Sequence, residues 1–474
     1  MRKMCTREIS DFAVSCAVKN GAEYADALFE NSSSSSVVLK NGTPQAAGMD
    51  MASGMGIRIL AGGCSVFLSE SKPDKETLKK KIRAALNSIS RKEHLFKKTG
   101  LSTEPVYKKE YAVKQKKKTE DITVQEKFGL LKQIDDAAIV NQSKPASRYL
   151  ALSDGVSERF FVNSEGSQIL SRIPTVGIFY FVTVKGRRHT LQRAWQQGFS
   201  GGFERIEQIN PVGDVKKNVD SMVRAASSGV KAPKGVLDVV TGPEITGIMV
   251  HESGGHPYEA DRILGAEAAQ AGGSFLTVKH PGTRIGSPLV SIADDPTIPN
   301  SFGFFLYDDE GVKARKKLLV KDGIVNGFLH NRETALKMGV RSNGSSRCSG
   351  FNRQPVVRMS NTFMLPGDQK EEELIEGVRR GIYIKNFMEW NIDDVRMSQR
   401  YVGGAAYLIR NGKIGAPVLN PVLEITTPAL YSAIDGIADN LEFSAGTCGK
   451  AEPMQGVPVW MGGPSIRLKA VRFR

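Results

Sequence analysis

Three two-residue turn signals constrain the fold of this 474-residue chain more than any other feature. Asn41-Gly42, Asp322-Gly323 and Asn411-Gly412 each lie between runs of apolar and β-branched residues. Such pairs favour the type I′ turn, because both central residues of that turn need a positive φ. The sequence therefore predicts β-hairpins both early and late in the chain, and with them antiparallel sheets.

Helical and strand-like patterns alternate around these turns. Apolar residues recur at helical spacing over residues 5–20, 75–92, 121–140, 212–227 and 370–380. No short-period repeat occurs, which argues against solenoids and propellers. The predicted class is α+β, with an N-terminal α/β domain followed by a strand-rich C-terminal domain that has large antiparallel sheets.

Composition shifts suggest where the chain divides. We expect an N-terminal α+β domain at 1–95, a basic linker at 96–118, a middle α+β region at 119–230 and a C-terminal domain at 231–474. Strand-like runs in these regions include 148–153, 158–163, 168–173, 175–184, 302–311 and 316–330. The run at 175–184 is apolar enough to be a central strand.

The net charge of +15 is concentrated in one segment. Residues 79–118 hold 14 Lys/Arg and 3 Glu, a net of +11, which leaves +4 for the rest of the chain. A solvated helix face followed by an exposed linker explains this better than a nucleic-acid site, because no aromatic stacking platform accompanies the charge.

Targeting and redox signals are weak. No stretch approaches the roughly 18 apolar residues that a membrane span needs, and the N-terminus lacks an apolar signal region. We therefore expect a cytoplasmic protein that contacts no membrane. The cysteines are odd in number and scattered, unlike a disulfide framework. They are Cys5, Cys16, Cys64, Cys348 and Cys448.

The strongest chemical signal is the run from His251 to His256, which reads His-Glu-Ser-Gly-Gly-His. In the common HExxH zinc motif the histidines are four residues apart, and both reach one metal. Here they are five apart, which on an ideal helix separates them by about 140°. Gly254, Gly255 and Pro257 disfavour a regular helix. We therefore predict a widened or broken turn, such as a π-bulge, over residues 253–257.

Each polar residue of this run has a chemical interpretation. His251 and His256 are candidate metal ligands, and Glu252 is placed to take a proton from metal-activated water. Glu259 and Asp261 could hydrogen-bond the imidazole N–H groups of the ligands. They could equally be ordinary solvated acids near a helix end.

A catalytic zinc usually has a third protein ligand. The residues leave several candidates open: Cys348, Cys448, His280, His330 and the carboxylates. Cys448 is flanked by glycines, and nearby Lys450 would favour its thiolate form. Lone histidines such as His280 and His330 are more often structural.

The chain resembles the TldD/PmbA family of metallopeptidases, on the catalytic TldD side. Matching motifs lie at 251–261, 307–335, 355–368 and 446–469, and the N-terminal strand pattern also fits, so the resemblance covers almost the whole chain. The segment 386–409 fits the family pattern less well.

The resemblance implies Zn²⁺ held by His251, His256 and Cys448, with Glu252 as the general base. It also implies a homodimer, or a heterodimer with an inactive PmbA/TldE-like relative, acting on unfolded or flexible peptides that bind as an added strand. The alternatives are a non-catalytic zinc-binding scaffold subunit of a peptidase complex and a nucleic-acid-binding protein that uses residues 79–118.

Overall fold

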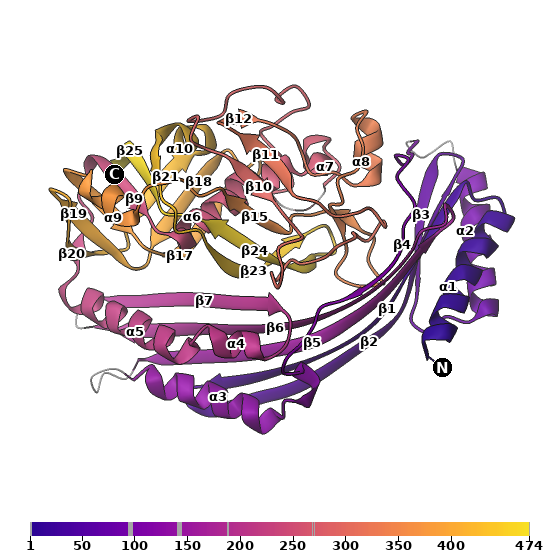
Figure 1. Ribbon diagram of the computed structural model, residues 1–474, viewed down its shortest axis with the longest axis horizontal. Helices are drawn as coiled ribbons and strands as arrows, with labels where there is room; N and C mark the ends of the chain where they lie inside the picture. The colour runs from indigo at the N-terminus through magenta and orange to yellow at the C-terminus, as the bar shows by residue number, and fades with distance from the viewer. Residues whose placement is uncertain are drawn as a thin grey trace.

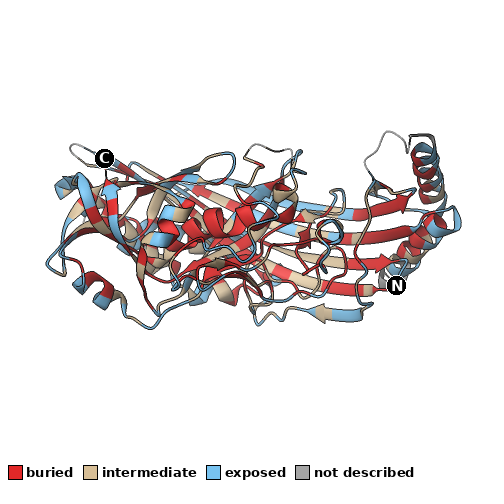
Figure 2. Cartoon of the chain, turned by 90° about the horizontal axis from the view of Figure 1, so that it is seen from above, coloured by how far each residue is buried: buried red, intermediate tan, exposed pale blue. Residues whose placement is uncertain are grey.

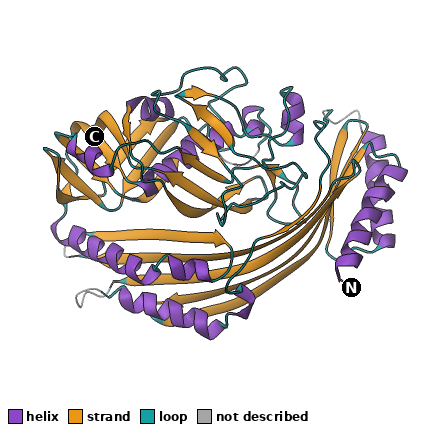
Figure 3. Cartoon of the chain, in the orientation of Figure 1, coloured by secondary structure: helices purple, strands orange, loops and turns teal. Residues whose placement is uncertain are grey.

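A computed structural model shows a long curved sheet whose inner side is filled by the C-terminal half of the chain (Figure 1). Helices line the outer side of the same sheet (Figure 3). The fold is α+β with large antiparallel sheets, as the sequence predicts. The structure describes residues 2–92, 98–139, 145–186, 189–267, 269 and 271–473.

The curved sheet has seven strands, in the order β3-β2-β1-β5-β6-β4, with β7 also paired to β6. Runs that the sequence separates are continuous here: 148–153 joins 158–163 in β5, and 168–173 joins 175–184 in β6. The strands are β1 (Tyr24–Lys40), β2 (Thr43–Ala61), β3 (Cys64–Glu70), β4 (Lys108–Ala112), β5 (Ser147–Asn163), β6 (Gln168–Lys185) and β7 (Thr190–Ser200).

This sheet draws its strands from both predicted N-terminal regions. β1, β2 and β3 lie within 1–95, whereas β5, β6 and β7 lie within 119–230. The predicted linker contributes β4, which pairs in parallel with β6. The domain boundaries at 95, 118 and 230 stay predictions.

The helices on the outer side are amphipathic and bury one face against the sheet. α5, for example, buries Val215, Val219, Met222, Ala225 and Ala226, which recur at helical spacing. α1 and α2 cover the far end of the sheet and leave their outer faces exposed (Figure 2). These helices are α1 (Arg2–Lys19), α2 (Lys75–Lys92), α3 (Val124–Ala137), α4 (Glu204–Gln208) and α5 (Pro211–Ser228), with a 3₁₀ turn at Thr119–Asp121.

Two further sheets organise the C-terminal half. One has the order β12-β11-β10-β15-β24-β23, and the other β22-β25-β9-β16-β19-β20-β8. The first comprises β10 (Ile292–Asp294), β11 (Lys317–Lys321), β12 (Ile324–Val325), β15 (Asn361–Met364), β23 (Glu442–Lys450) and β24 (Gln455–Gly463). The second comprises β8 (Val230–Lys231), β9 (Gly235–Thr241), β16 (Arg380–Ile384), β19 (Ala406–Arg410), β20 (Lys413–Leu419), β22 (Ile434–Ile437) and β25 (Ile466–Phe473).

A small three-stranded sheet and short helices complete this half. The hairpin β17 (Phe387–Ile392) and β18 (Ser398–Gly403) pairs with β21 (Val422–Thr426), and β13 (Ser346–Arg347) pairs with β14 (Val356–Val357). α6 (Pro243–Val250) follows β9 and packs on β15, β23 and β24. The others are α7 (Ala260–Ile263), α8 (Arg332–Lys337), α9 (Glu371–Glu376) and α10 (Thr427–Ala433). None of the helices described is long and apolar enough to cross a membrane.

All three predicted two-residue turns are confirmed. Each connects two strands of an antiparallel pair, and both residues of each turn have a positive φ between 47° and 80°. The turn chemistry therefore fixed these hairpins locally.

The strand predicted at 302–311 is wrong, because this segment is a loop. The Asp308 carboxylate accepts backbone N–H bonds from Glu310, Val312 and Ser346 at 2.9–3.0 Å. A side chain that satisfies the backbone in this way competes with a strand ladder.

Buried ion pairs join the curved sheet to the C-terminal half. Arg58 on β2 pairs with both Asp26 and Glu310, and all three side chains are buried. Arg332, also buried, reaches the exposed Glu165 at 2.7 Å across the same junction. A buried charge that loses its partner is costly, so these pairs fix how the two halves dock.

We expect Glu310→Gln to destabilise the protein by about 3 kcal/mol, because the substitution leaves Arg58 with one buried partner instead of two. The shift of the urea unfolding midpoint measures this. Asp439→Asn, which breaks the exposed Lys370–Asp439 pair, is the control and should change little. Equal midpoints for the two variants would contradict the role given to the junction.

Candidate metal centre

The helix widens at the two histidines. α6 passes into a π-helical turn at His251–Gly255, and a 3₁₀ turn follows at His256–Tyr258. The backbone N–H of His256 donates to the carbonyl of His251, an i to i−5 bond. The predicted widening is confirmed, and it begins two residues earlier than expected. A π-turn brings residues five apart onto one side, which a regular helix cannot do.

The two glycines of this turn are needed for space. A Cβ atom on Gly255 would lie 1.9 Å from Met359 Sδ, and one on Gly254 would lie 2.7 Å from Ile292 Cδ1. Neither glycine has a positive φ. Close approach, rather than unusual backbone geometry, therefore explains their presence.

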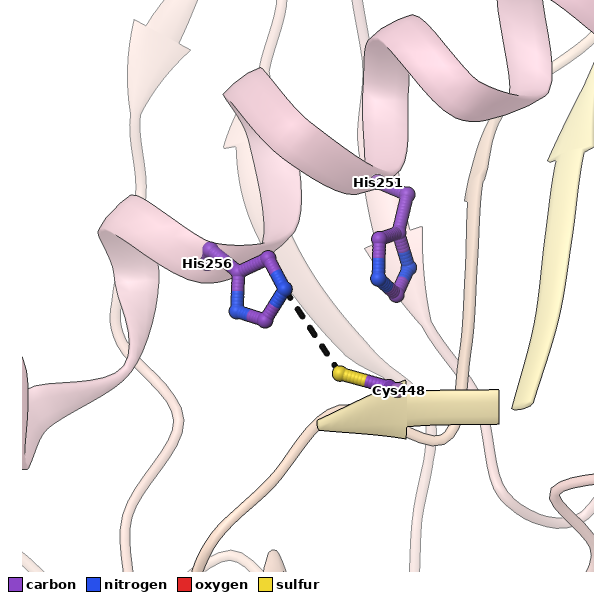
Figure 4. Close-up of side chains that lie close together, drawn as sticks. All are labelled: His251, His256 and Cys448. Carbon is purple, nitrogen blue, oxygen red and sulfur yellow. Dashed lines mark hydrogen bonds between the residues drawn. The ribbon is translucent and has the colours of Figure 1, made fainter. Parts of the chain in front are cut away.

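His251, His256 and Cys448 converge on one point (Figure 4). One ligand atom from each lies within 4.8 Å of the others, and Cys448 Sγ is 3.5 Å from His256 Nε2. The imidazole rings are 4.9 Å apart at 82°. Cys448 comes from the edge strand β23, almost 200 residues further along the chain. All three side chains are buried, with exposures of 3–6%.

The donor set fits a zinc ion. His251 Nδ1 is buried without a hydrogen-bond partner in the described part of the chain. Burial lowers the pKa of His251, so the ring stays neutral, as a ligand must. Burial opposes ionisation of Cys448, but the neighbouring His256 outweighs it and lowers the thiol pKa to about 7. Two imidazoles and a thiolate are typical zinc ligands.

Glu259 orients His256. Its Oε2 accepts a 3.0 Å bond from His256 Nδ1–H, which leaves Nε2 facing Cys448. Arg262 and Lys450 pair with the same carboxylate, whose exposure is 0%. Burial alone would raise the pKa of Glu259, but the charges of Lys450, Arg262 and His256 bring it well below its usual range. Glu259 is therefore a buried acid that holds its ring, and not a solvated one.

Asp261 bonds to Lys450 and not to a candidate metal ligand. Its Oδ1 accepts a 2.7 Å bond from Lys450, and the described contacts include none from Asp261 to an imidazole. Lys450 also donates to the carbonyl of Val357, so this lysine joins β23 both to β14 and to residues 259–261, which follow the turn that carries the histidines. Burial raises the pKa of Asp261.

Glu252 is held by two residues that the sequence analysis missed. Trp390 Nε1 donates to Oε1 at 3.1 Å, and Arg396 pairs with Oε2. Burial tends to raise the pKa of Glu252, but His256 and Arg396 outweigh it, so the net pKa is lowered. Trp390 and Arg396 belong to the β17–β18 hairpin, more than 130 residues from Glu252. No local pattern in the sequence marks such contacts.

The other candidate ligands lie elsewhere. Cys348 is beside Asp309, 3.4 Å from its carboxylate, at the junction with the curved sheet. His280 Nδ1 accepts from the backbone N–H of Thr277. His330 is buried, which lowers its pKa to about 4. In the described chain, only His251, His256 and Cys448 form a cluster of three metal-ligating side chains.

A cavity of about 480 Å³ opens beside this cluster. It receives side chains from the curved sheet, the widened helix, the β17–β18 hairpin and β23. His251, Glu252, His256 and Cys448 all line it, so a molecule in the cavity can reach the candidate metal site.

The fold and the site define a candidate metalloenzyme, and comparison with known proteins gives its family. Models of the PmbA/TldA metallopeptidase domain 1, central domain and C-terminal domain match residues 25–89, 117–227 and 234–474. The chain belongs to the PmbA/TldD metallopeptidase family. The resemblance seen in the sequence is therefore confirmed.

Curated relatives carry protease names. A metalloprotease of Methanothermobacter thermautotrophicus is 32% identical over 454 residues, which cover 95% of each chain. A zinc metalloprotease TldD homolog of Saccharolobus solfataricus is 26% identical over 340 residues, covering 71% of this chain and 73% of that protein.

Solved structures share the fold. A Thermotoga maritima protein described as a candidate modulator of a DNA gyrase has a TM-score of 0.79 at 19% identity, covering 99% of this chain and all of that one. TldE from Thermococcus kodakarensis has a TM-score of 0.76 at 15% identity, covering 98% and 99%. At these identities the likeness establishes the fold.

We expect Glu259→Gln to weaken zinc binding about 10- to 100-fold, because the substitution removes the charge that orients His256. Competition with a coloured chelator measures the affinity. Asp261→Asn is the matched control: it also removes a charge from Lys450 but leaves the His256 contact, so its effect should be smaller. A larger loss in Asp261→Asn would contradict the assignment.

Proposed function

We propose that this chain is a zinc-dependent peptidase that hydrolyses peptide bonds in unfolded or flexible peptides. The supporting observation is the buried cluster of His251, His256 and Cys448 with Glu252 beside it, all opening into one cavity. Family membership and the protease names of the relatives agree with this proposal.

The proposed ligands of zinc are His251 and His256 of the widened turn and Cys448 of β23. When bound, zinc supplies a Lewis acid that polarises a peptide carbonyl and makes water more acidic. A thiolate ligand donates more charge than an imidazole, so the Lewis acid would be milder than one held by three histidines.

Glu252 is the proposed general base. Its carboxylate takes a proton from the attacking water and returns it to the leaving amine. Trp390 and Arg396 each occupy one oxygen, but a carboxylate has about four lone-pair positions, so Glu252 can accept a proton while both contacts persist. The positive charge of Arg396 keeps the resting carboxylate ionised.

Strand β23 offers a place for the peptide backbone. In the described pairings it bonds to β24 on one side only, so no strand pairs with its other edge. Residues 444–449 of this strand line the cavity. An extended peptide that pairs with this edge would pass Cys448, and such pairing requires an unfolded segment.

The proposed assembly is a dimer, either of two copies or with an inactive PmbA/TldE-like relative. The shared fold with TldE is the observation that supports a pairing of related chains. A nucleic-acid role for residues 79–118 is the weaker alternative. Lys75, Lys80, Lys81 and Arg83 of α2 are exposed, whereas Leu78, Ile82 and Ile89 are buried, as in an ordinary surface helix.

We expect Glu252→Gln to lower peptide hydrolysis by about 10²- to 10⁴-fold while zinc stays bound, because the amide cannot act as a base. Cleavage of a casein-derived peptide mixture, followed by mass spectrometry, measures this. Glu389→Gln, on the same hairpin as Trp390 but exposed, is the control and should keep full activity.

Two outcomes would overturn this account. Full activity in Glu252→Gln would place the base elsewhere. A wild-type protein that binds zinc but cleaves no peptide, alone or with an inactive family relative added, would favour the scaffold alternative.

A further inference from the structure

Many of the side chains that line the cavity beside the metal centre are apolar, whereas the metal centre itself consists of polar and ionisable groups. We propose that this cavity binds a bulky apolar side chain of the peptide, next to the bond that is cleaved, and that the β17–β18 hairpin sets this preference. The inference rests on the proposed peptidase function and adds the class of substrate.

Apolar side chains form the walls of the cavity. They come from three separate parts of the fold, which are the inner face of the curved sheet, the helix α6 with β24, and the hairpin. The main contributors are Phe179, Ile248, Phe387, Met388, Trp390 and Met461. A cavity of about 480 Å³ with such walls is large enough for an aromatic side chain together with its backbone.

The carboxylate and guanidinium groups in the lining each have a charged partner. Glu252 pairs with Arg396, and both oxygens of Glu244 accept from Arg193 at 2.7–3.0 Å. These groups therefore offer no unpaired charge to a charged substrate side chain. Burying such a chain there would cost its hydration without supplying a partner, whereas an apolar chain loses little.

Trp390 presents an uncovered aromatic surface. The residue is 42% exposed, and its indole N–H is fixed by the bond to Glu252. Phe387 packs edge-on against it, with ring centroids 5.3 Å apart at 88°. A rigid aromatic surface held against the general base is suited to cover an apolar side chain at the reacting bond.

The hairpin, which spans residues 387–403, is separate in the sequence from the candidate metal ligands. The metal cluster and Glu252 lie on other elements. Residues that choose the substrate can therefore vary without disturbing the ligands. Met388 suits a test of this division, because it lines the cavity and makes none of the contacts described for Glu252.

The test uses fluorescent Gly/Ser-rich peptides that are identical except for one central residue, which is Phe, Leu, Ala, Lys or Glu. Binding is measured by fluorescence anisotropy and cleavage by mass spectrometry, on the zinc-loaded wild type, Met388→Glu and Met388→Leu. We expect the wild type to prefer Phe and Leu over Ala about 10- to 100-fold, and over Glu by more. Met388→Leu should retain this preference, because it conserves apolar volume. Met388→Glu should lose it and gain affinity for the Lys peptide.

The two readouts separate this inference from the proposed function. Selective binding of Phe and Leu peptides without cleavage would uphold the cavity assignment and overturn the peptidase. Cleavage that is equal for all five peptides would overturn the cavity assignment and leave the peptidase intact. Absence of both binding and cleavage, or an unchanged preference in Met388→Glu, would also overturn the cavity assignment.

Discussion

The arrangement of the metal centre depends on one backbone hydrogen bond. In it, the N–H of His256 donates to the carbonyl of His251, five residues back. In a regular helix these side chains would point about 140° apart. The π-turn brings them to one side, where their rings lie 4.9 Å apart. Met359 and Ile292 lie so close to the turn that a Cβ atom at 254 or 255 would require their side chains to move. The metal centre therefore depends on tight packing beneath it as much as on its ligands.

Charge balance keeps this buried site together. The carboxylates of Glu252, Glu259 and Asp261 are each met by a cation, from Arg396, Arg262 or Lys450. Arg358, fully buried, adds bonds to the carbonyls of Cys448 and Gln455 and so fixes the β23–β24 hairpin. Removing one member would leave a buried charge unpaired, so the network ties β23 and the β17–β18 hairpin to the widened turn. The same contacts hold Glu252, the three candidate ligands and the hairpin wall of the cavity in fixed positions relative to one another.

The sequence predicted what is decided locally. The Asn-Gly and Asp-Gly turns need positive φ at fixed positions. The spacing of His251 and His256 is incompatible with one shared metal on a regular helix, which predicted the widened turn. Long-range contacts could not be predicted from the sequence. No local pattern near Glu252 indicates that Trp390 and Arg396 contact it. The strand predicted at 302–311 is a loop because the Asp308 carboxylate bonds to its backbone. Cys448 shows the limit of what the sequence alone can predict. Its neighbours made it one of several candidates, the family resemblance singled it out, and the structure places it beside both histidines.

The most direct test of the central claim is the zinc content of purified protein by elemental mass spectrometry. Wild type, Cys448→Ser and Cys348→Ser are compared after purification without chelator and reconstitution with zinc. Three protein ligands should hold about one zinc per chain in the wild type and in Cys348→Ser, and far less in Cys448→Ser. A wild type without zinc, or full zinc retention in Cys448→Ser, would contradict the account.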